Sequence, residues 1–141
     1  GAVAALELQY KLQRVGVRAV VHTDPEMQVI SATLLTVEDA AVGISHSGAS
    51  DEVRHALSVA KQSGARTIAI TNHPVSPIAA LADIQLRTAA QEALAHGYPL
   101  GARVAQVALI DVLYAVLAQK RPDESERSLN RIAEVLYRRR R

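Results

Sequence analysis

The sequence predicts an α/β fold of three layers, with a parallel sheet between two layers of helices. Short, continuous apolar runs such as Ala40–Ile44 and Thr67–Thr71 alternate with longer segments of helical periodicity. Runs that are apolar at every position are typical of strands covered on both faces, and strands that alternate with helices form parallel sheets. The composition, 49% hydrophobic and 21% charged residues, is that of an ordinary globular protein.

In the first third of the chain, three elements are predicted. Val3–Val15 carries a helical apolar stripe and ends at Gly16. The apolar centre of Arg18–Thr23 predicts a strand. Asp24 is a natural N-cap and is followed by a proline, so a helix is expected over Pro25–Leu35.

The middle of the chain continues the alternation. A buried strand is predicted over Ala40–Ile44, and a helix follows over Asp51–Ser63, which Gly64 would end. Thr67–Thr71 is the next buried strand. These two strands and the helix between them form one βαβ unit.

The last third is predicted to be mostly helical. A short helix over Pro77–Ala82 leads to Ile84–Arg87, an edge strand because its pattern alternates. Two helices close the chain, Leu100–Gln119 and Glu124–Arg138, and Pro122 separates them.

The helix Leu100–Gln119 is apolar around nearly its whole circumference, which indicates burial on more than one side. A partner subunit would supply the second side, and a fully internal helix in a monomer is the alternative. Its apolar stretch Val104–Ala118 is interrupted by Gln106 and Asp111, and we expect it to fall short of a membrane span.

Length and charge narrow the class of protein. The 141 residues fit one domain over 1–141, and the absence of cysteine excludes disulfides and cysteine catalysis and is compatible with the cytoplasm. The net charge of +2 is too small to indicate nucleic-acid binding. The run Arg138–Arg141 is expected to be a solvated helix end, with a DNA or partner contact as the alternative.

The segment Ser45–Ser50 is the candidate binding site. It ends a predicted strand and opens a helix, so its backbone N–H groups, the helix dipole and three hydroxyls all favour an anion such as phosphate. Gly48 would permit a close approach of the backbone or a positive φ, although a plain turn glycine is the alternative. His46 is either a donor to the ligand or an exposed spacer. The alternative for Ser50 is that it only caps the start of the following helix. Asp51 and Glu52 are expected to point away from the anion.

These residues resemble a known family. Ser45-His46-Ser47-Gly48-Ala49-Ser50 matches the Ser-x-Ser-Gly-x-Ser/Thr motif of SIS (sugar isomerase) domains. Ile70-Thr71-Asn72 with Ser76–Ala79 resembles the following strand and turn, and Thr88–Glu92 resembles the segment with the family's ligand-facing glutamate. Ile44–Gly48 and Asp111–Tyr114 look most like the C-terminal sensor domain of RpiR-type transcriptional regulators. The resemblance implies a flavodoxin-like parallel sheet and a sugar-phosphate ligand.

The resemblance also implies roles for individual residues. The phosphate would bind Ser45, His46, Ser47, Gly48, Ala49 and Ser50, and Glu92 would bind the sugar hydroxyls. In isomerases of this family that glutamate serves as the base, whereas a solvated loop acid is the alternative here. Asn72 either lines the pocket or forms the turn before Pro74.

SIS domains usually begin with a strand and a Gly-x-Gly-x-Ser turn, and Gly1-Ala2-Val3 resembles the residues just after that turn. We therefore expect the first strand, and the helix-turn-helix domain of such regulators, to lie upstream of Gly1. DNA would be bound only through that upstream domain. A homodimer or tetramer is expected because of the long apolar helix.

Three functions follow as hypotheses. The first is a cytoplasmic, non-catalytic sensor of a phosphorylated sugar or sugar acid, with no cofactor, metal or membrane partner. The second is a sugar-phosphate isomerase or related lyase with Glu92 as base. The third is a nucleotide-binding module, against which the absence of Gly-x-Gly-x-x-Gly and of a P-loop argues. The histidines show no metal-ligand spacing.

Overall fold

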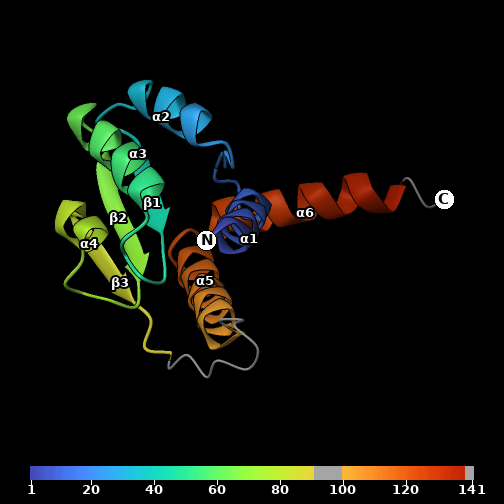
Figure 1. Ribbon diagram of the computed structural model, residues 1–141. Helices are drawn as coiled ribbons and strands as arrows, with labels where there is room; N and C mark the ends of the chain where they lie inside the picture. Colours follow the sequence, from blue (N-terminus) through green and yellow to red (C-terminus); the bar gives the residue numbers. More distant parts are fainter. Residues whose placement is uncertain (91–99, 139–141) are drawn as a thin grey trace.

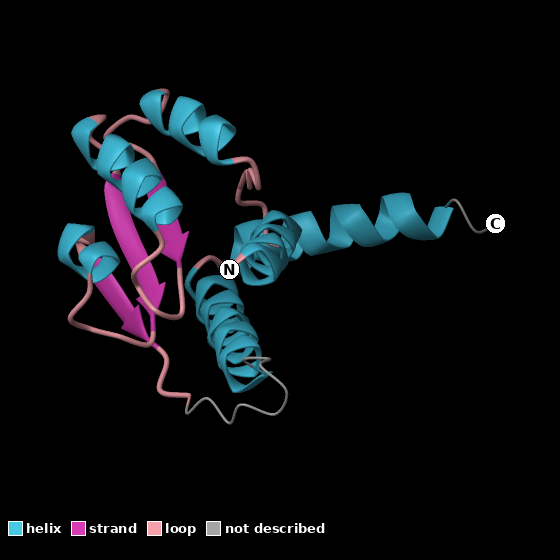
Figure 2. Cartoon of the chain, viewed as in Figure 1, coloured by secondary structure: helices cyan, strands magenta, loops and turns pink. Residues whose placement is uncertain are grey.

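The computed structural model describes residues 1–90 and 100–138, which form a three-layer α-β-α sandwich (Figure 1). The elements along the chain are α1 (Ala2–Arg14), α2 (Pro25–Thr33), β1 (Ala40–Ile44), α3 (Asp51–Gln62), β2 (Arg66–Thr71), α4 (Pro77–Leu81), β3 (Ile84–Arg87), α5 (Leu100–Lys120) and α6 (Pro122–Arg138). Figure 2 shows the sheet with α3 and α4 on one face and α1 and α5 on the other. The predicted three-layer fold is confirmed.

The sheet of the described residues has the order β1-β2-β3, with every pair parallel. Ile44 pairs with Ile70, and Ile70 pairs with Leu86. All three strands therefore end at the same edge of the sheet, and β3 lies at an outer position as predicted.

Neighbouring residues of the strands face opposite layers, because side chains alternate along a strand. Ile44 and Ile70 pack with Ala4, Leu8 and Ile110 in the layer of α1 and α5. One position earlier in β2, Ala69 packs on the other face with Leu57 of α3 and Ile78 of α4.

Gly43 explains how closely α3 approaches the sheet. A Cβ on Gly43 would lie 3.0 Å from Val53 Cγ1 and 3.4 Å from Leu57 Cδ2. Any larger side chain here would push α3 away from β1, and with α3 the loop that precedes it.

The predicted strand over Arg18–Thr23 is wrong, since these residues have no regular structure. A strand exists only through its ladder of hydrogen bonds, and among the described residues β1 is bonded only to β2. Instead of a neighbouring strand, glutamine side chains donate hydrogen bonds to two carbonyl groups of this segment. Gln13 Nε2 donates to the carbonyl of Ala19, and Gln28 Nε2 donates to that of His22.

The long helix α5 is buried on one side only. Ala102, Gln106 and Ile110 are buried, whereas Val104, Val112 and Val116 are exposed. The alternative of a fully internal helix is therefore wrong, and a second covering surface is not supplied by the described residues.

The expectation that the apolar stretch of this helix is too short to span a membrane is also wrong. Residues Gly101–Lys120 are long and apolar enough to cross a membrane by length and composition. Core helices of soluble proteins meet the same criterion. On its buried side, α5 contributes Ile110 to the core that α1 and the sheet share.

Most element boundaries agree with the prediction to within two residues. Pro122 has a different role from the one predicted. It was expected to separate the last two helices, but it is the first residue of α6. Proline is favoured at this position, where its missing N–H would have no helical partner.

Asp83 fixes the start of β3 to the start of β2. Its carboxylate accepts hydrogen bonds from the Thr67 amide at 2.9 Å and the Thr67 hydroxyl at 3.2 Å, and Lys61 Nζ lies 3.5 Å away. The amide hydrogen bond from Thr67, followed by the charge of Lys61, lowers the pKa of Asp83 below its ordinary value of 3.8.

Replacing Asp83 by Asn should destabilise the fold at neutral pH, because the amide keeps one acceptor oxygen but loses the charge. A lowered pKa in the folded state means that the ionised form contributes stability above pH 3.8, and that this contribution is lost as the pH falls through the folded-state pKa. Urea unfolding at a series of pH values should show the gap between wild type and variant closing in acid. The control is Glu38→Gln, which removes a carboxylate from an exposed loop. Its difference from wild type in the free energy of unfolding should not shrink in acid in the way expected for Asp83→Asn.

Candidate functional site

The loop Ser45–Ser50 lies at the carboxyl edge of the sheet, between the end of β1 and the start of α3. The Ser45 amide donates to the Ile70 carbonyl at 3.0 Å, and the Asn72 amide donates to the His46 carbonyl at 3.1 Å. These two bonds extend the β1–β2 ladder past the end of β1. The start of α1 lies at the same edge, since a Cβ on Gly1 would lie 2.6 Å from the Ile44 carbonyl oxygen.

Each of the three hydroxyls of the loop accepts a hydrogen bond from a nearby amide. Ser45 Oγ accepts from Gly48 N–H at 3.1 Å, Ser47 Oγ from Ala49 N–H at 3.2 Å, and Ser50 Oγ from Val53 N–H at 3.4 Å. Ser50 is thus the N-cap of α3. Because each oxygen accepts, each hydroxyl proton remains able to donate to a further acceptor.

The loop also presents backbone donors. Within the described part of the chain, the amides of Ser47, Ser50 and Asp51 have no hydrogen-bond acceptor. Ser47 and Asp51 are exposed and Ser50 is half-buried. Free amides at the first turn of a twelve-residue helix, next to an exposed hydroxyl, are an arrangement that binds an anion.

Gly48 has a positive φ of 70°, which is one of the roles that the sequence left open for it. It also allows a close approach, but to protein rather than ligand. A Cβ on Gly48 would lie 2.3 Å from Ser76 Oγ and 3.0 Å from Thr71 Oγ1. The Gly48 carbonyl accepts from the Ile78 amide at 3.2 Å, so the loop is held against the segment after β2.

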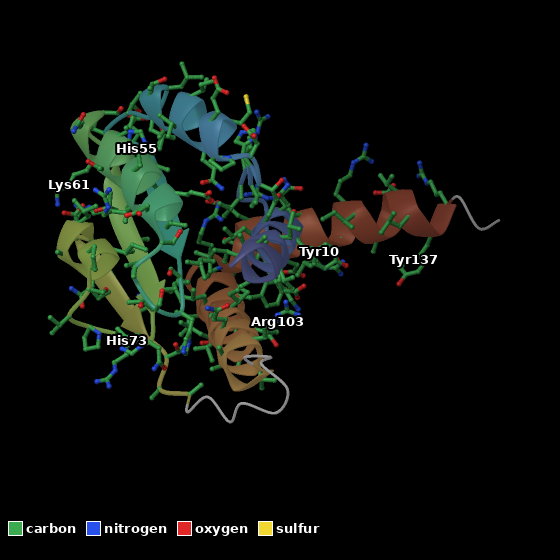
Figure 3. All side chains as sticks on the ribbon, viewed as in Figure 1. Tyr10, His55, Lys61, His73, Arg103 and Tyr137 are labelled. Atoms are coloured by element: carbon green, nitrogen blue, oxygen red, sulfur yellow. The ribbon has the colours of Figure 1, made fainter. Side chains whose placement is uncertain are left out.

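His46 lies beside a second histidine that sequence reasoning missed. The rings of His46 and His73 meet edge to face, with centroids 5.9 Å apart and planes at 76°. His46 is half-buried, which excludes the fully exposed spacer. Each histidine comes two residues after the end of its strand. Because the two strands are parallel neighbours, this equal spacing could have indicated that the histidines lie close together. Figure 3 shows His73 at this end of the molecule.

Asn72 joins the ends of β2 and β3 rather than serving the turn alone. Its side-chain oxygen accepts from Thr88 Oγ1 at 3.4 Å, while the Thr88 amide donates to the Thr71 carbonyl at 3.0 Å. Thr88 is buried at the carboxyl edge. Glu92, the predicted sugar-binding residue, lies outside the described residues.

A hollow of about 250 Å³ opens at the start of α1, on the side of α5. Residues 1–4 line it together with Arg103, Gln106 and Val107. Gln106 is 4% exposed, so its amide is a polar group inside an otherwise apolar layer. Sequence reasoning treated Gln106 only as an interruption of an apolar helix and did not consider Arg103, an exposed cation near the carboxyl edge (Figure 3).

The acidic residues after the loop point away from it, as expected. Asp51 is exposed and pairs with Arg54 at 3.5 Å within α3. Glu52 lines a separate hollow between α2 and α3 together with His55. Arg54 thereby offsets part of the negative charge of Asp51 beside the loop. The described residues contain no cluster of three or more metal-ligating side chains.

Comparison with known proteins agrees with this architecture. Residues 1–116 match the SIS domain family. An uncharacterized HTH-type transcriptional regulator of Caldanaerobacter subterraneus subsp. tengcongensis is 37% identical over 134 residues, which are 95% of this chain and 48% of the regulator. The chain spans about half the length of the curated relatives it matches.

Two solved structures are similar over nearly the whole chain. The Vibrio vulnificus NanR protein, complexed with ManNAc-6P, has a TM-score of 0.87 and 29% identity, covering 96% of this chain and 51% of NanR. The sugar isomerase domain of an RpiR transcription factor from Sphaerobacter thermophilus has a TM-score of 0.81 and 27% identity, covering 95% of this chain and 73% of the other. The resemblance stated from the loop motif is confirmed.

Replacing Gly48 by Ala should destabilise the fold by about 3 kcal/mol, because a left-handed backbone with a Cβ is strained and Ser76 leaves no room for the methyl group. Urea unfolding measures this change. The matched control is Gly64→Ala, which has φ of 97° but whose Cβ would lie 3.1 Å from Val37 Cγ1 and 3.8 Å from Val37 N, without the overlap found at Gly48. It should cost about 1 kcal/mol. Equal losses in the two variants would contradict the proposed contact between loop and Ser76.

Proposed function

The chain belongs to the SIS domain family, and on that premise we propose that it is the sugar-phosphate-sensing effector domain of an RpiR-type transcriptional regulator. The single observation that carries the proposal is the group of free donors in Ser45–Ser50, where the amides of Ser47, Ser50 and Asp51 meet the first turn of α3. Such a group is suited to the phosphate of a ligand.

The phosphate would be held chiefly by neutral donors. The exposed Ser47 hydroxyl and the free amides supply hydrogen bonds, and the dipole of α3 supplies the favourable potential. Ser45 is buried and its hydroxyl holds the Gly48 amide, so it would shape the loop and donate through its proton. Gly48 and Ala49 would complete the backbone of the site.

The sugar would lie across the carboxyl edge toward β3. Thr88 is fixed there by Asn72, and Glu92 follows it by four residues, which supports Glu92 as the acceptor for sugar hydroxyls. His46, held by His73, is the candidate donor on the same edge. NanR, the structural neighbour, is complexed with a phosphorylated amino sugar, ManNAc-6P, which supports this ligand class.

The proposal is for a sensor and not an enzyme, because the relatives are named transcriptional regulators. DNA would be bound by a helix-turn-helix domain in the remaining half of such a regulator, in the cytoplasm. We infer a homodimer or tetramer, supported by the exposed valines of α5. Ligand binding would favour one arrangement of the assembled domains over another, which is how a sensor alters DNA binding.

Ser47→Ala should weaken binding of a sugar phosphate about tenfold to a hundredfold, since it removes one hydrogen bond to a charged group. Isothermal titration calorimetry with ManNAc-6P and a panel of pentose and hexose phosphates measures the change. Because the Ser47 hydroxyl bonds only to the Ala49 amide two residues on, the fold should be unaffected.

The matched control is Ser63→Ala, at the other end of α3, where the hydroxyl donates to the Val59 carbonyl. It should bind as the wild type does. Binding that is unchanged by Ser47→Ala, or equal binding of the dephosphorylated sugar, would contradict the proposed phosphate site.

The wild-type chain should bind a sugar phosphate without converting it. Incubation followed by NMR of the sugar should show no aldose–ketose exchange. Turnover that is lost in Glu92→Gln would instead establish the isomerase, with Glu92 as base.

A further inference from the structure

The start of α1 presents backbone donors that no group in the described part of the chain accepts. Gly1 is the N-cap and has no side chain to receive a hydrogen bond, and the first turn contains no acidic residue. Within residues 1–90 and 100–138, the amides of Ala2, Val3 and Ala4 have no hydrogen-bond acceptor. This end of the helix therefore keeps its partial positive charge, and it borders the hollow of about 250 Å³ beside α5.

The side chain of Gln106 is a second and independent feature of the same hollow. It lines the hollow, is 4% exposed, and forms no hydrogen bond with any residue that the structure describes. Polar groups buried this deeply nearly always have a hydrogen-bond partner, because losing water without a replacement is unfavourable. A buried amide that borders an open hollow is therefore suited to a polar group that enters from outside.

Arg103 lies about one helical turn before Gln106 and borders the same hollow (Figure 3). It is exposed and has no ion-pair partner among the described residues. The described residues that line the hollow include no Asp or Glu, so no negative charge competes for the arginine there. A planar carboxylate fits the fork of a guanidinium, because its two oxygens can accept two parallel hydrogen bonds.

The hollow lies beside the phosphate loop, on the other side of the end of β1. A Cβ on Gly1 would lie 2.6 Å from the carbonyl oxygen of Ile44, and the loop begins with the next residue, Ser45. Ile110, one turn after Gln106, packs with Ile44 in the core. From this point the loop turns toward α3, whereas the hollow opens toward α5. A ligand with an anionic group at each end of a short carbon chain is suited to contact both.

We propose that the hollow between α1 and α5 binds a carboxylate, and that the ligand of this chain is a phosphorylated sugar acid. The inference rests on the proposed phosphate site at Ser45–Ser50 and adds the class of group at the other end of the ligand. Arg103 pairs with both carboxylate oxygens, and the Gln106 amide and the start of α1 donate to one of them. The hydroxyls between the two ends face the carboxyl edge of the sheet. A hydroxymethyl group in place of the carboxylate has no charge, so the site distinguishes the acid from the corresponding alcohol.

Matched pairs of ligands test the carboxylate directly. Each pair consists of an aldonic acid phosphate and the alditol phosphate of the same configuration, which has a hydroxymethyl group in place of the carboxylate. The pairs are 4-phosphoerythronate with erythritol 4-phosphate, 5-phosphoribonate with ribitol 5-phosphate, and 6-phosphogluconate with glucitol 6-phosphate. Isothermal titration calorimetry should show the acid of at least one pair binding about tenfold more tightly than its alditol, because it gains charge-assisted hydrogen bonds.

Arg103→Gln should remove this preference. The affinity for the acid should fall about tenfold, while the affinity for the alditol phosphate stays within about twofold of the wild-type value. Ser47→Ala, in the phosphate loop, should weaken both members of a pair alike. The control is Arg66→Gln, which makes the same change of charge in an exposed residue at the opposite edge of the sheet and should keep the preference.

Gln106→Leu distinguishes binding from a structural role. Because the buried amide has no partner among the described residues, an apolar side chain of similar size should leave the stability to urea unchanged or raised. The preference for the acid should nevertheless fall. Lost stability with an unchanged preference would show that Gln106 serves only the fold, and it would overturn the role of Gln106 in the site.

Equal binding of acid and alditol in all three pairs would overturn the proposal and leave the phosphate site in place. A preference that survives Arg103→Gln would overturn it as well. If none of the six compounds binds, the phosphate site itself is contradicted, and the carboxylate site is contradicted with it.

Discussion

The hydrogen bond from the Ser45 amide to the Ile70 carbonyl is the interaction on which the candidate site depends. It keeps the chain in register with β2 for one residue after β1 ends, so the loop turns toward α3 at a fixed point. The Asn72 amide, bonded to the His46 carbonyl, then fixes the next residue, and Asn72 in turn receives the Thr88 hydroxyl. The ends of three strands are thereby tied into one edge on which a ligand can be bound.

The loop is organised before any ligand arrives. Its serine oxygens are occupied as acceptors of local amides, which fixes their positions, while their protons stay available. A phosphate can therefore gain hydrogen bonds without the loop breaking those that shape it. This is the physical meaning of preorganisation, and it reduces the entropy lost on binding. Ser76 and Ile78 contribute from the other side by holding Gly48.

Sequence patterns predicted the features that local chemistry determines. The strand Ala40–Ile44 and the N-cap Ser50 follow from a few neighbouring residues, and both are present. The positive φ of Gly48 is one of the roles that the sequence left open. Features that depend on contacts with residues far away in the sequence were missed or wrongly predicted. Arg18–Thr23 has strand composition but no strand beside it, and the pairing of His46 with His73 depends on the register of two strands. The exposure of α5 on one side depends on the arrangement of whole layers.

The outer edge of β1 has a consequence for how the protein behaves in solution. Within the described residues β1 bonds to β2 alone, and its five residues include no charged side chain and no proline. Natural sheets usually protect such an edge with lysine, proline or a covering segment, because unpaired amides and carbonyls recruit strands from other chains. We therefore expect the colloidal stability of the isolated chain to be governed by this edge more than by its small net charge.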